Sequence, residues 1–316
     1  MFRTILVPLD GSMFGEHALP LALDLARKSG ATLHLTHVLL PLSSVFADAP
    51  PFVTGAVEGQ LLDQQRLSEQ NYLSETRQRL TEAGAANVET SLAEGDVPTA
   101  IRQKAAELGA DLIVMSTHGY GPFARFWLGS VADELVRGPR TAPLLLVHPA
   151  EGEAQLDHPP PVKSVLLPLD GSHLAEQMIE PAATLAQAVG AEVLLLRVIK
   201  PLLPPTVPVD GQSFGHMVKE LVDQTEELQE KIRKEAMDYL TKVAEPLRRR
   251  CLVVRTLVEA EETPTAAILR HTNDTDMVAL ATHGYRGLSR LFLGSVADKV
   301  VRGAHLPVMV WRPQEA

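Results

Sequence analysis

Aromatic residues are scarce in this chain, at 4% of 316 residues, and only one cysteine is present. With so few rings, the core has to be built from Leu, Val, Ile and Ala, which suits parallel strands covered by helices on both faces. A single cysteine excludes an internal disulfide, and a reducing compartment is the natural setting. No apolar run approaches the roughly 20 residues of a membrane span, and the first residues do not resemble a signal peptide. We therefore expect a soluble cytoplasmic protein.

Positive charge is also in short supply, because 29 Lys and Arg residues face 39 Asp and Glu residues, a net charge of −10. Proteins that bind nucleic acid need a basic stripe against the phosphates, and none is present. The one basic run, residues 248–250, is explained by cations at the end of a helix. We expect no nucleic-acid partner and no membrane partner.

An internal repeat organises the chain. Residues 3–41 recur as residues 163–201, including the segment PLDGS, and residues 116–138 recur as residues 281–303 with 14 of 23 positions identical. Duplication is the simplest interpretation. The sequence predicts one domain over residues 1–149, a linker over 150–162 that is rich in Pro, Gly and charge, and a second domain over 163–316.

Each copy shows strands alternating with helices. In the first copy, short apolar runs predict buried strands, and the helical spacing of apolar residues between them predicts helices. Proline in a first turn and glycine after a last turn mark helix boundaries. The expected strands are 4–8, 33–39, 88–92, 111–115 and 143–147, and the expected helices follow Ser12 and cover about 61–82, 98–108 and 130–136. This order predicts an α/β fold with an open, twisted, five-stranded parallel sheet in each copy.

Ligands of such sheets bind beyond the carboxyl ends of the strands, which here selects the loops after the first and fourth strands. After the fourth strand, Ser116 and Gly119 are followed by nine residues and then by Gly129 and Ser130 at the start of a helix. The second copy repeats this with Ala281, Gly284, Gly294 and Ser295. Small residues let the backbone present N–H groups to an anion, and a helix start favours phosphate.

The loop after the first strand supplies a carboxylate, Asp10 in one copy and Asp170 in the other. Such a carboxylate could accept hydrogen bonds from ribose hydroxyls or help to hold a metal on phosphates. Alternatively, the Asp-Gly-Ser segment only forms an Asx turn and caps a helix. The glycine-rich loop beside it favours the first interpretation.

These motifs resemble the ATP-binding branch of the universal stress protein family, over essentially the whole chain. The resemblance implies Rossmann-like domains of the adenine-nucleotide alpha hydrolase type, with ATP and Mg as the expected ligand. It implies contacts to ribose from the first-strand aspartate, to adenine from the end of the second strand, and to phosphate from the glycine loop. By position, the implied site residues of the first copy are Pro8, Asp10, Val38, Met115, Ser116, Gly119, Gly129, Ser130 and Val131. Those of the second copy are Pro168, Asp170, Val198, Leu280, Ala281, Gly284, Gly294, Ser295 and Val296.

One departure from the family pattern concerns its first glycine, which is Ser116 in the first copy and Ala281 in the second. Both residues keep the backbone N–H, but each adds a Cβ that would be costly if the position required a positive φ. Ser116 also offers a hydroxyl, which favours the first site.

Other motifs carry weaker signals. Residues 119–124 match a dinucleotide-binding pattern, but they follow the fourth strand and the second copy breaks the pattern; no P-loop is present. His118 and His283 lie inside the repeated loop and are interpreted as structural, and Asp133 and Asp298 are explained by their place in the first turn of a helix. His34 and His37 are expected in the core or at a sheet edge, and Cys251 is expected to be inert.

Three functions remain open. The first is an ATP-binding stress-response protein in which nucleotide sets conformation or partner affinity, and the second is a slow ATP hydrolase in which Arg125 and Arg290 reach the phosphates. The third is an interaction protein whose sites no longer bind nucleotide. Members of the family that the chain resembles pair through their last strands, so the resemblance implies an internal pseudo-dimer through the apolar last strands, 144–147 and 306–310, with a homodimer through the same strands as a further expectation. The inserts 41–60 and 201–216 are candidate lids over the adenine end.

Overall fold

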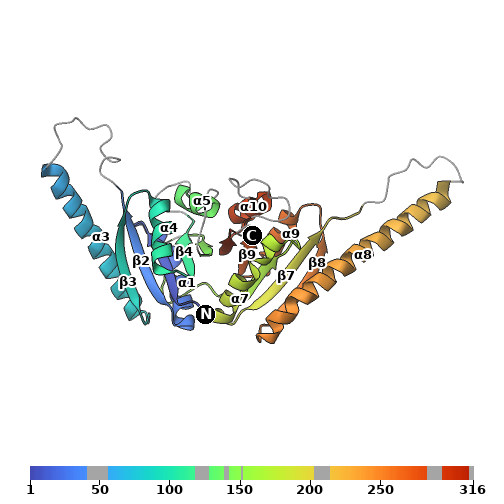
Figure 1. Cartoon of the computed structure of the whole chain (residues 1–316), viewed down its shortest axis with the longest axis horizontal. Helices are drawn as coiled ribbons and strands as arrows, with labels where there is room; N and C mark the ends of the chain where they lie inside the picture. Colours follow the sequence, from blue (N-terminus) through green and yellow to red (C-terminus); the bar gives the residue numbers. More distant parts are fainter. Residues whose placement is uncertain are drawn as a thin grey trace.

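The computed structural model describes residues 1–40, 56–117, 128–138, 142–150, 152–202, 214–282 and 294–312. Within them, the two copies have the same order of strands and helices (Figure 1). The first copy consists of β1 (Thr4–Leu9), the 3₁₀ turn η1 (Gly15–Ala18), α1 (Leu19–Ser29), β2 (Thr32–Leu39), α3 (Ala56–Glu82), β3 (Val88–Glu94), α4 (Val97–Leu108), β4 (Leu112–Ser116), α5 (Ser130–Arg137) and β5 (Leu144–Val147). The predicted strands and helices of this copy are all present, with shifts of a few residues at their ends.

The second copy repeats this order. It consists of β6 (Ser164–Pro168), α6 (His173–Glu176), α7 (Ile179–Val189), β7 (Glu192–Ile199), α8 (Phe214–Arg249), β8 (Val254–Ala260), α9 (Pro264–His271), β9 (Met277–Ala281), α10 (Ser295–Gly303) and β10 (Val308–Trp311). Between β5 and β6, the described residues form neither helix nor strand. None of the described helices is both long and apolar enough to cross a membrane.

The ten strands found in the described residues form one sheet, in the order β3-β2-β1-β4-β5-β10-β9-β6-β7-β8. Neighbours within each copy are parallel, whereas β5 and β10 are antiparallel, with Leu145 opposite Met309. The predicted pseudo-dimer is therefore joined through the last strand of each copy. Because β5 and β10 are paired on both sides within the chain, a second chain could add to either strand only by displacing a neighbour.

Helices cover both faces of this sheet (Figure 1). On one face, apolar residues of α1, α3, α7 and α8 form a single buried cluster with strand residues of both copies. On the other face, α4, α5, α9 and α10 form a second such cluster. Each cluster runs across the β5–β10 junction, and α1 also packs against α7, so the two domains share their hydrophobic layers.

The first helix of each copy shows why the sequence produces these elements. Helix α1 buries the apolar side of its 11 residues against the sheet and ends at Gly30, whose φ of 73° is easy only for glycine. Gly190 ends α7 in the same way, with a φ of 74°. A glycine after the last turn was the expected sign of a helix end, and Gly30 and its counterpart Gly190 both provide it.

The segment after Ser12 differs from its prediction. A single helix was expected there, but η1 forms first, and the Ser12 hydroxyl accepts a hydrogen bond from the N–H of Gly15 at 3.0 Å before α1 begins. In the second copy, Ser172 does cap a short helix, α6, by accepting from the N–H of Ala175. The two copies thus close the same turn with different helical geometry.

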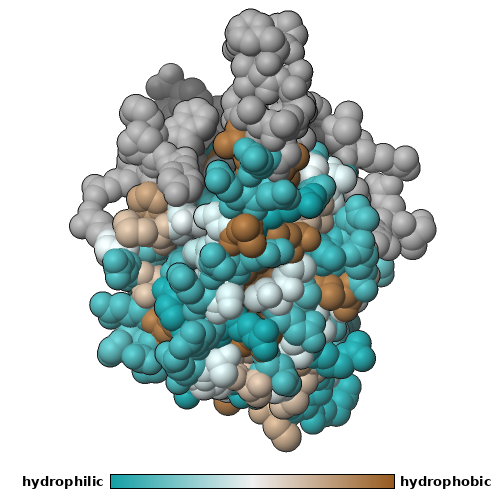
Figure 2. All heavy atoms as spheres, turned by 90° about the vertical axis from the view of Figure 1, so that its left-hand side faces the viewer, coloured by the Kyte–Doolittle hydropathy of each residue, from teal (hydrophilic) through white to brown (hydrophobic). Residues whose placement is uncertain are grey.

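A long helix packs against each outer strand of the sheet, α3 against β3 and α8 against β8. Figure 2 views the molecule from the α3 side and shows mostly hydrophilic residues with scattered apolar ones between them.

Candidate functional site

The turn after the first strand of each copy holds an aspartate in a fixed position. The Asp10 Oδ1 atom accepts hydrogen bonds from the Ser12 N–H at 3.1 Å and from the Ser12 hydroxyl at 2.6 Å. The Asp170 Oδ1 atom accepts the equivalent bonds from Ser172 at 2.9 and 2.5 Å. The Asx turn considered from the sequence is therefore present. It also holds each carboxylate at the carboxyl end of its strand, so the structural role and the binding role are compatible.

A glycine precedes the helix that was expected to receive phosphate. The Gly129 N–H donates to the Thr117 carbonyl at 2.8 Å, and the Gly294 N–H donates to the Thr282 carbonyl at 2.9 Å. These bonds tie the start of α5 to the end of β4, and the start of α10 to the end of β9. Neither glycine has a side chain that could cap the helix, and no side chain of the described residues caps the first turn of α5 or of α10. The start of a helix in this state favours an anion.

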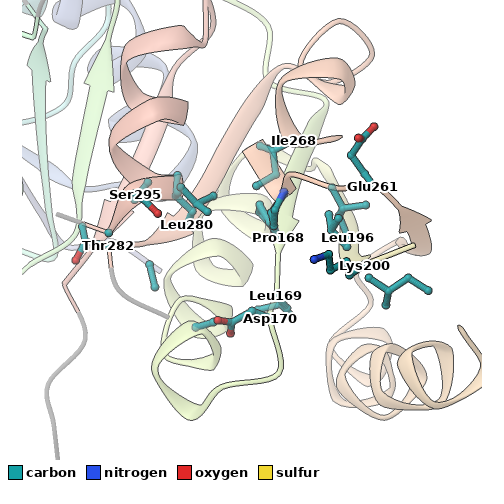
Figure 3. Close-up of a pocket in the computed structure, with 18 of the residues that line it drawn as sticks. Pro168, Leu169, Asp170, Leu196, Lys200, Glu261, Ile268, Leu280, Thr282 and Ser295 are labelled. Carbon is teal, nitrogen blue, oxygen red and sulfur yellow. The ribbon is translucent and has the colours of Figure 1, made fainter. Parts of the chain in front are cut away.

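In the second copy, these elements surround a pocket of about 580 Å³ (Figure 3). Its walls come from the carboxyl ends of β6, β7 and β9, from the turn at Asp170, and from the first turns of α9 and α10. The predicted residues that line it are Pro168, Asp170, Val198, Leu280, Ala281, Gly294, Ser295 and Val296. Gly284, the remaining prediction in this copy, lies outside the described residues, as does Gly119 in the first copy.

The predicted residues of the first copy lie at the matching positions. Pro8 and Asp10 are at the end of β1, and Val38 is near the end of the neighbouring strand β2. In the register of these two strands, Pro8 lies opposite Thr36, two residues before Val38. Met115 and Ser116 end β4, and Gly129, Ser130 and Val131 begin α5. Met115, Ser116 and Val38 are buried, with exposed fractions of 8, 6 and 8%. The sheet therefore brings all of these positions to one end of the first domain.

The two residues that replace the first glycine of the loop adopt ordinary strand conformations. Ser116 is paired with Val147 in the β4–β5 ladder, and Ala281 is paired with Trp311 in the β9–β10 ladder. Among the described residues, Cys251 is the only non-glycine residue with a positive φ. The conformational cost that a Cβ would carry at a positive φ therefore does not arise at either position.

Several residues that line the pocket were not predicted from the sequence. Lys200 and Glu261 lie just beyond the ends of β7 and β8, next to Glu262, Pro264 and Ile268. The signal that could have found them is their place at strand ends. The ends of the second and third strands lie at the same edge of the sheet as those of the first and fourth, which is where ligands of parallel sheets bind. Their counterparts in the first copy, Leu40 and Gly95, carry no charge.

A second layer of side chains braces the Asp170 turn. The Arg197 Nη1 atom donates to the Leu169 carbonyl at 3.3 Å, and its guanidinium lies 5.7 Å from the centre of the Tyr239 ring. The Tyr239 hydroxyl in turn donates to the Glu176 carboxylate at 3.0 Å. Burial, followed by the hydrogen bond to Glu176 and its negative charge, raises the pKa of Tyr239 far above its ordinary value, so this hydroxyl stays a donor.

The two histidines of β2 belong to the first domain and do not line the pocket of the second. His34 and His37 are buried, as expected, with exposed fractions of 6 and 9%. The His34 Nε2 atom is 2.9 Å from the Ser91 hydroxyl, and burial lowers the pKa of His34 below its ordinary value. Cys251 is exposed at the end of α8. His118, His283, Arg125 and Arg290 lie outside the described residues.

Comparison with known proteins identifies relatives for both halves. A family model described as the universal stress protein family matches residues 1–148 and 161–312. A universal stress protein of Mycolicibacterium smegmatis is 27% identical over 314 residues, which cover 98% of this chain and 97% of that protein. A putative universal stress protein of Staphylococcus haemolyticus is 32% identical over 138 residues, 43% of this chain and 79% of that protein. The crystal structure of a universal stress protein from Archaeoglobus fulgidus aligns with a TM-score of 0.63 at 19% identity and covers 98% of both chains.

Proposed function

The chain belongs to the universal stress protein family, and on that premise we propose that it binds ATP, with Mg²⁺ on the phosphates, to control conformation or partner affinity in a cytoplasmic stress response. The observation that carries the proposal is the pocket of the second domain, which is lined by all of the described residues predicted there. Its volume of about 580 Å³ falls within the range of small-molecule sites.

The chemistry of the pocket suits the parts of a nucleotide. The start of α10 offers N–H groups and the positive end of the helix dipole to a phosphate chain. Asp170 offers a carboxylate to ribose hydroxyls, and the apolar surfaces of Val198 and Ile268 suit a planar base. Among the described residues, no group of three or more His, Cys, Asp or Glu is placed to hold a metal. Mg²⁺ would therefore be held mainly by the phosphates.

We propose binding without efficient hydrolysis. Phosphoryl transfer needs cations that stabilise charge on the transferred group, together with a positioned water or base. In the described lining the only cation is Lys200, which follows β7, whereas Ser295 begins α10 on the other side of the pocket (Figure 3). An interaction protein with degenerate sites is less well supported, because Ser116 and Ala281 adopt strand conformations at no backbone cost.

The direct test is calorimetric titration of the purified chain with ATP and Mg²⁺, together with analysis of nucleotide in an acid extract of the protein. We expect ATP to bind, and we expect the Asp170→Ala variant to lose about tenfold or more in affinity at the second site, as for a hydrogen bond to a charged group. Asp24→Ala is the control, because Asp24 forms a surface ion pair with Lys28 on α1. An extract without nucleotide and a titration without binding would refute the proposal.

A further inference from the structure

Two aspartates and two arginines form a cluster that joins the two domains. On α5, Arg137 binds Asp133 through two nitrogens, at 2.7 and 3.1 Å. On α10, Arg302 binds Asp298 through its Nε atom at 3.0 Å. Each pair is an ordinary i,i+4 pair within a helix, and the sequence explained both aspartates by the helix dipole alone.

The arginines also reach across the domain boundary. The Arg302 Nη2 atom lies 2.9 Å from Asp133 Oδ1, and the Arg137 Nη2 atom lies 3.8 Å from Asp298 Oδ1. All four side chains are partly buried. Arg302 is therefore shared between a carboxylate of its own helix and one of the other domain, and its two bonds are of nearly equal length.

This cluster lies one helical turn from both candidate phosphate sites. The Asp133 N–H donates to the Gly129 carbonyl at 2.8 Å, and the Asp298 N–H donates to the Gly294 carbonyl at 2.9 Å. Gly294 and the residues that follow it line the pocket of the second domain. A phosphate at the start of α10 would thus lie in the same helical turn as Asp298, the carboxylate of α10 that Arg302 binds.

We infer that this four-residue cluster couples the two sites, so that occupancy of one weakens binding at the other; the inference rests on the proposed function. A phosphate chain at the start of α10 adds negative charge beside Asp298 and draws the shared Arg302 guanidinium toward its own helix. Asp133 then loses part of its neutralisation, and its negative charge opposes a second phosphate at the start of α5. The same reasoning applies in reverse through Arg137.

The size of the effect follows from what one partly exposed ion pair is worth. Such a pair changes an equilibrium constant by about two- to fivefold. We therefore expect the second nucleotide to bind about two- to fivefold more weakly than it would to a chain whose other site is empty. Because the coupling is electrostatic, it should weaken as salt is raised.

The test compares the full chain with two single-site chains by titration with ATP and Mg²⁺. Asp10→Ala weakens the first site, so that the second is the strong site that is measured, and Asp170→Ala does the reverse. A coupling factor is the product of the two stepwise association constants of the unaltered chain, divided by the product of the constants of the two single-site chains. Intrinsic differences between the sites cancel in this ratio, so it reports the interaction alone.

We expect a factor of about 0.2–0.5 in the unaltered background, and a factor nearer to one when all three chains also carry Arg302→Gln, because only the longer contact of Arg137 with Asp298, at 3.8 Å, then remains across the boundary. Arg302→Lys is a second variant that keeps a positive charge beside Asp298 and so preserves the ion pair within α10. Its single ammonium cannot bind Asp133 and Asp298 together as the guanidinium does. Lys28→Gln, which removes a surface pair on α1, should leave the factor unchanged.

The outcomes separate the two proposals. Binding at both sites with a factor of one, or a factor that Arg302→Gln leaves unchanged, would overturn the coupling while the proposed function stands. Absence of nucleotide binding in the unaltered chain would overturn both.

Discussion

Gly11 and Gly171 occupy the same place in the two copies, directly after the site aspartate, and both have a φ of 77°. Their surroundings differ. A Cβ at Gly11 would have Glu69 Oε2 as its nearest neighbour, at 3.9 Å, which is an ordinary contact. A Cβ at Gly171 would lie 2.8 Å from the Arg197 Nη1 atom, which is too close. Substitution of each glycine by alanine therefore separates the cost of the backbone conformation from the cost of displacing Arg197.

The expected magnitudes follow from these contacts. An L-residue in the left-handed region costs about 1–2 kcal/mol, and alanine recovers about 0.4–1 kcal/mol by stiffening the unfolded chain. Gly11→Ala should therefore lower the free energy of unfolding by about 1 kcal/mol. Gly171→Ala should cost about 1 kcal/mol more, because Arg197 must give up its bond to the Leu169 carbonyl and its stacking on Tyr239.

Urea unfolding of the full chain, with hydrogen exchange of peptides from β1–β2 and β6–β7, would measure the two costs in their own domains. The contrast depends on Arg197, so in an Arg197→Ala background Gly171→Ala should cost no more than Gly11→Ala does. Equal destabilisation by the two alanines in the unaltered chain would show that the Arg197 contact is not what distinguishes the two turns.

Three further predictions concern stability. Burial lowers the pKa of His34, so the unfolded chain takes up a proton more readily than the folded chain, and the free energy of unfolding should fall as the pH drops below about 6.5. His34→Leu, which copies Leu194 of the second domain, should reduce the difference between the urea-unfolding free energies at pH 7.5 and pH 5. An unchanged difference would contradict this prediction. Asp276 Oδ2 accepts from the N–H groups of Lys163 and Ser164 and from the Ser164 hydroxyl, so Asp276→Ala should cost about 1–3 kcal/mol in urea unfolding, whereas equal stability would mean that water replaces these bonds. Tyr239→Phe removes the donor to Glu176 and should cost about 1 kcal/mol in the second domain, measured by thermal unfolding; a melting temperature equal to that of the unaltered chain would count against the brace.

Much of the fold was predictable because its signals are local. The strand Thr4–Leu9 is a continuous apolar run, which marks a strand buried on both faces, and Gly30 marks the end of the helix that follows. The internal repeat then allowed the same assignment in the second copy. The candidate site was predictable for the same reason, since Asp170 and Ser295 occupy repeated loops at strand ends.

What the sequence did not reveal depends on contacts between distant residues. Arg302 binds Asp133 across 169 positions of the chain, and no periodicity in either helix indicates that partner. The short 3₁₀ turn at Gly15 arises where Ser12 closes a turn with its own hydroxyl, although apolar spacing alone predicts a continuous helix. Local patterns determine the elements, whereas these features depend on how the elements meet.

The two copies differ unevenly along the candidate site. At the phosphate end, Gly129 and Gly294 make the same backbone bond to the preceding strand, and the helices that follow are joined by the shared arginines. At the other end, Leu40 in the first copy corresponds to Lys200 in the second. The phosphates of a bound nucleotide would therefore meet similar groups in both domains, whereas beyond the second strand the ligand would meet the Lys200 cation only in the second domain. The phosphate ends of the two candidate sites are alike, and they lie toward the domain boundary. Communication between the sites should therefore depend on the phosphate chain, and selectivity should depend on the part of the ligand farthest from the phosphates.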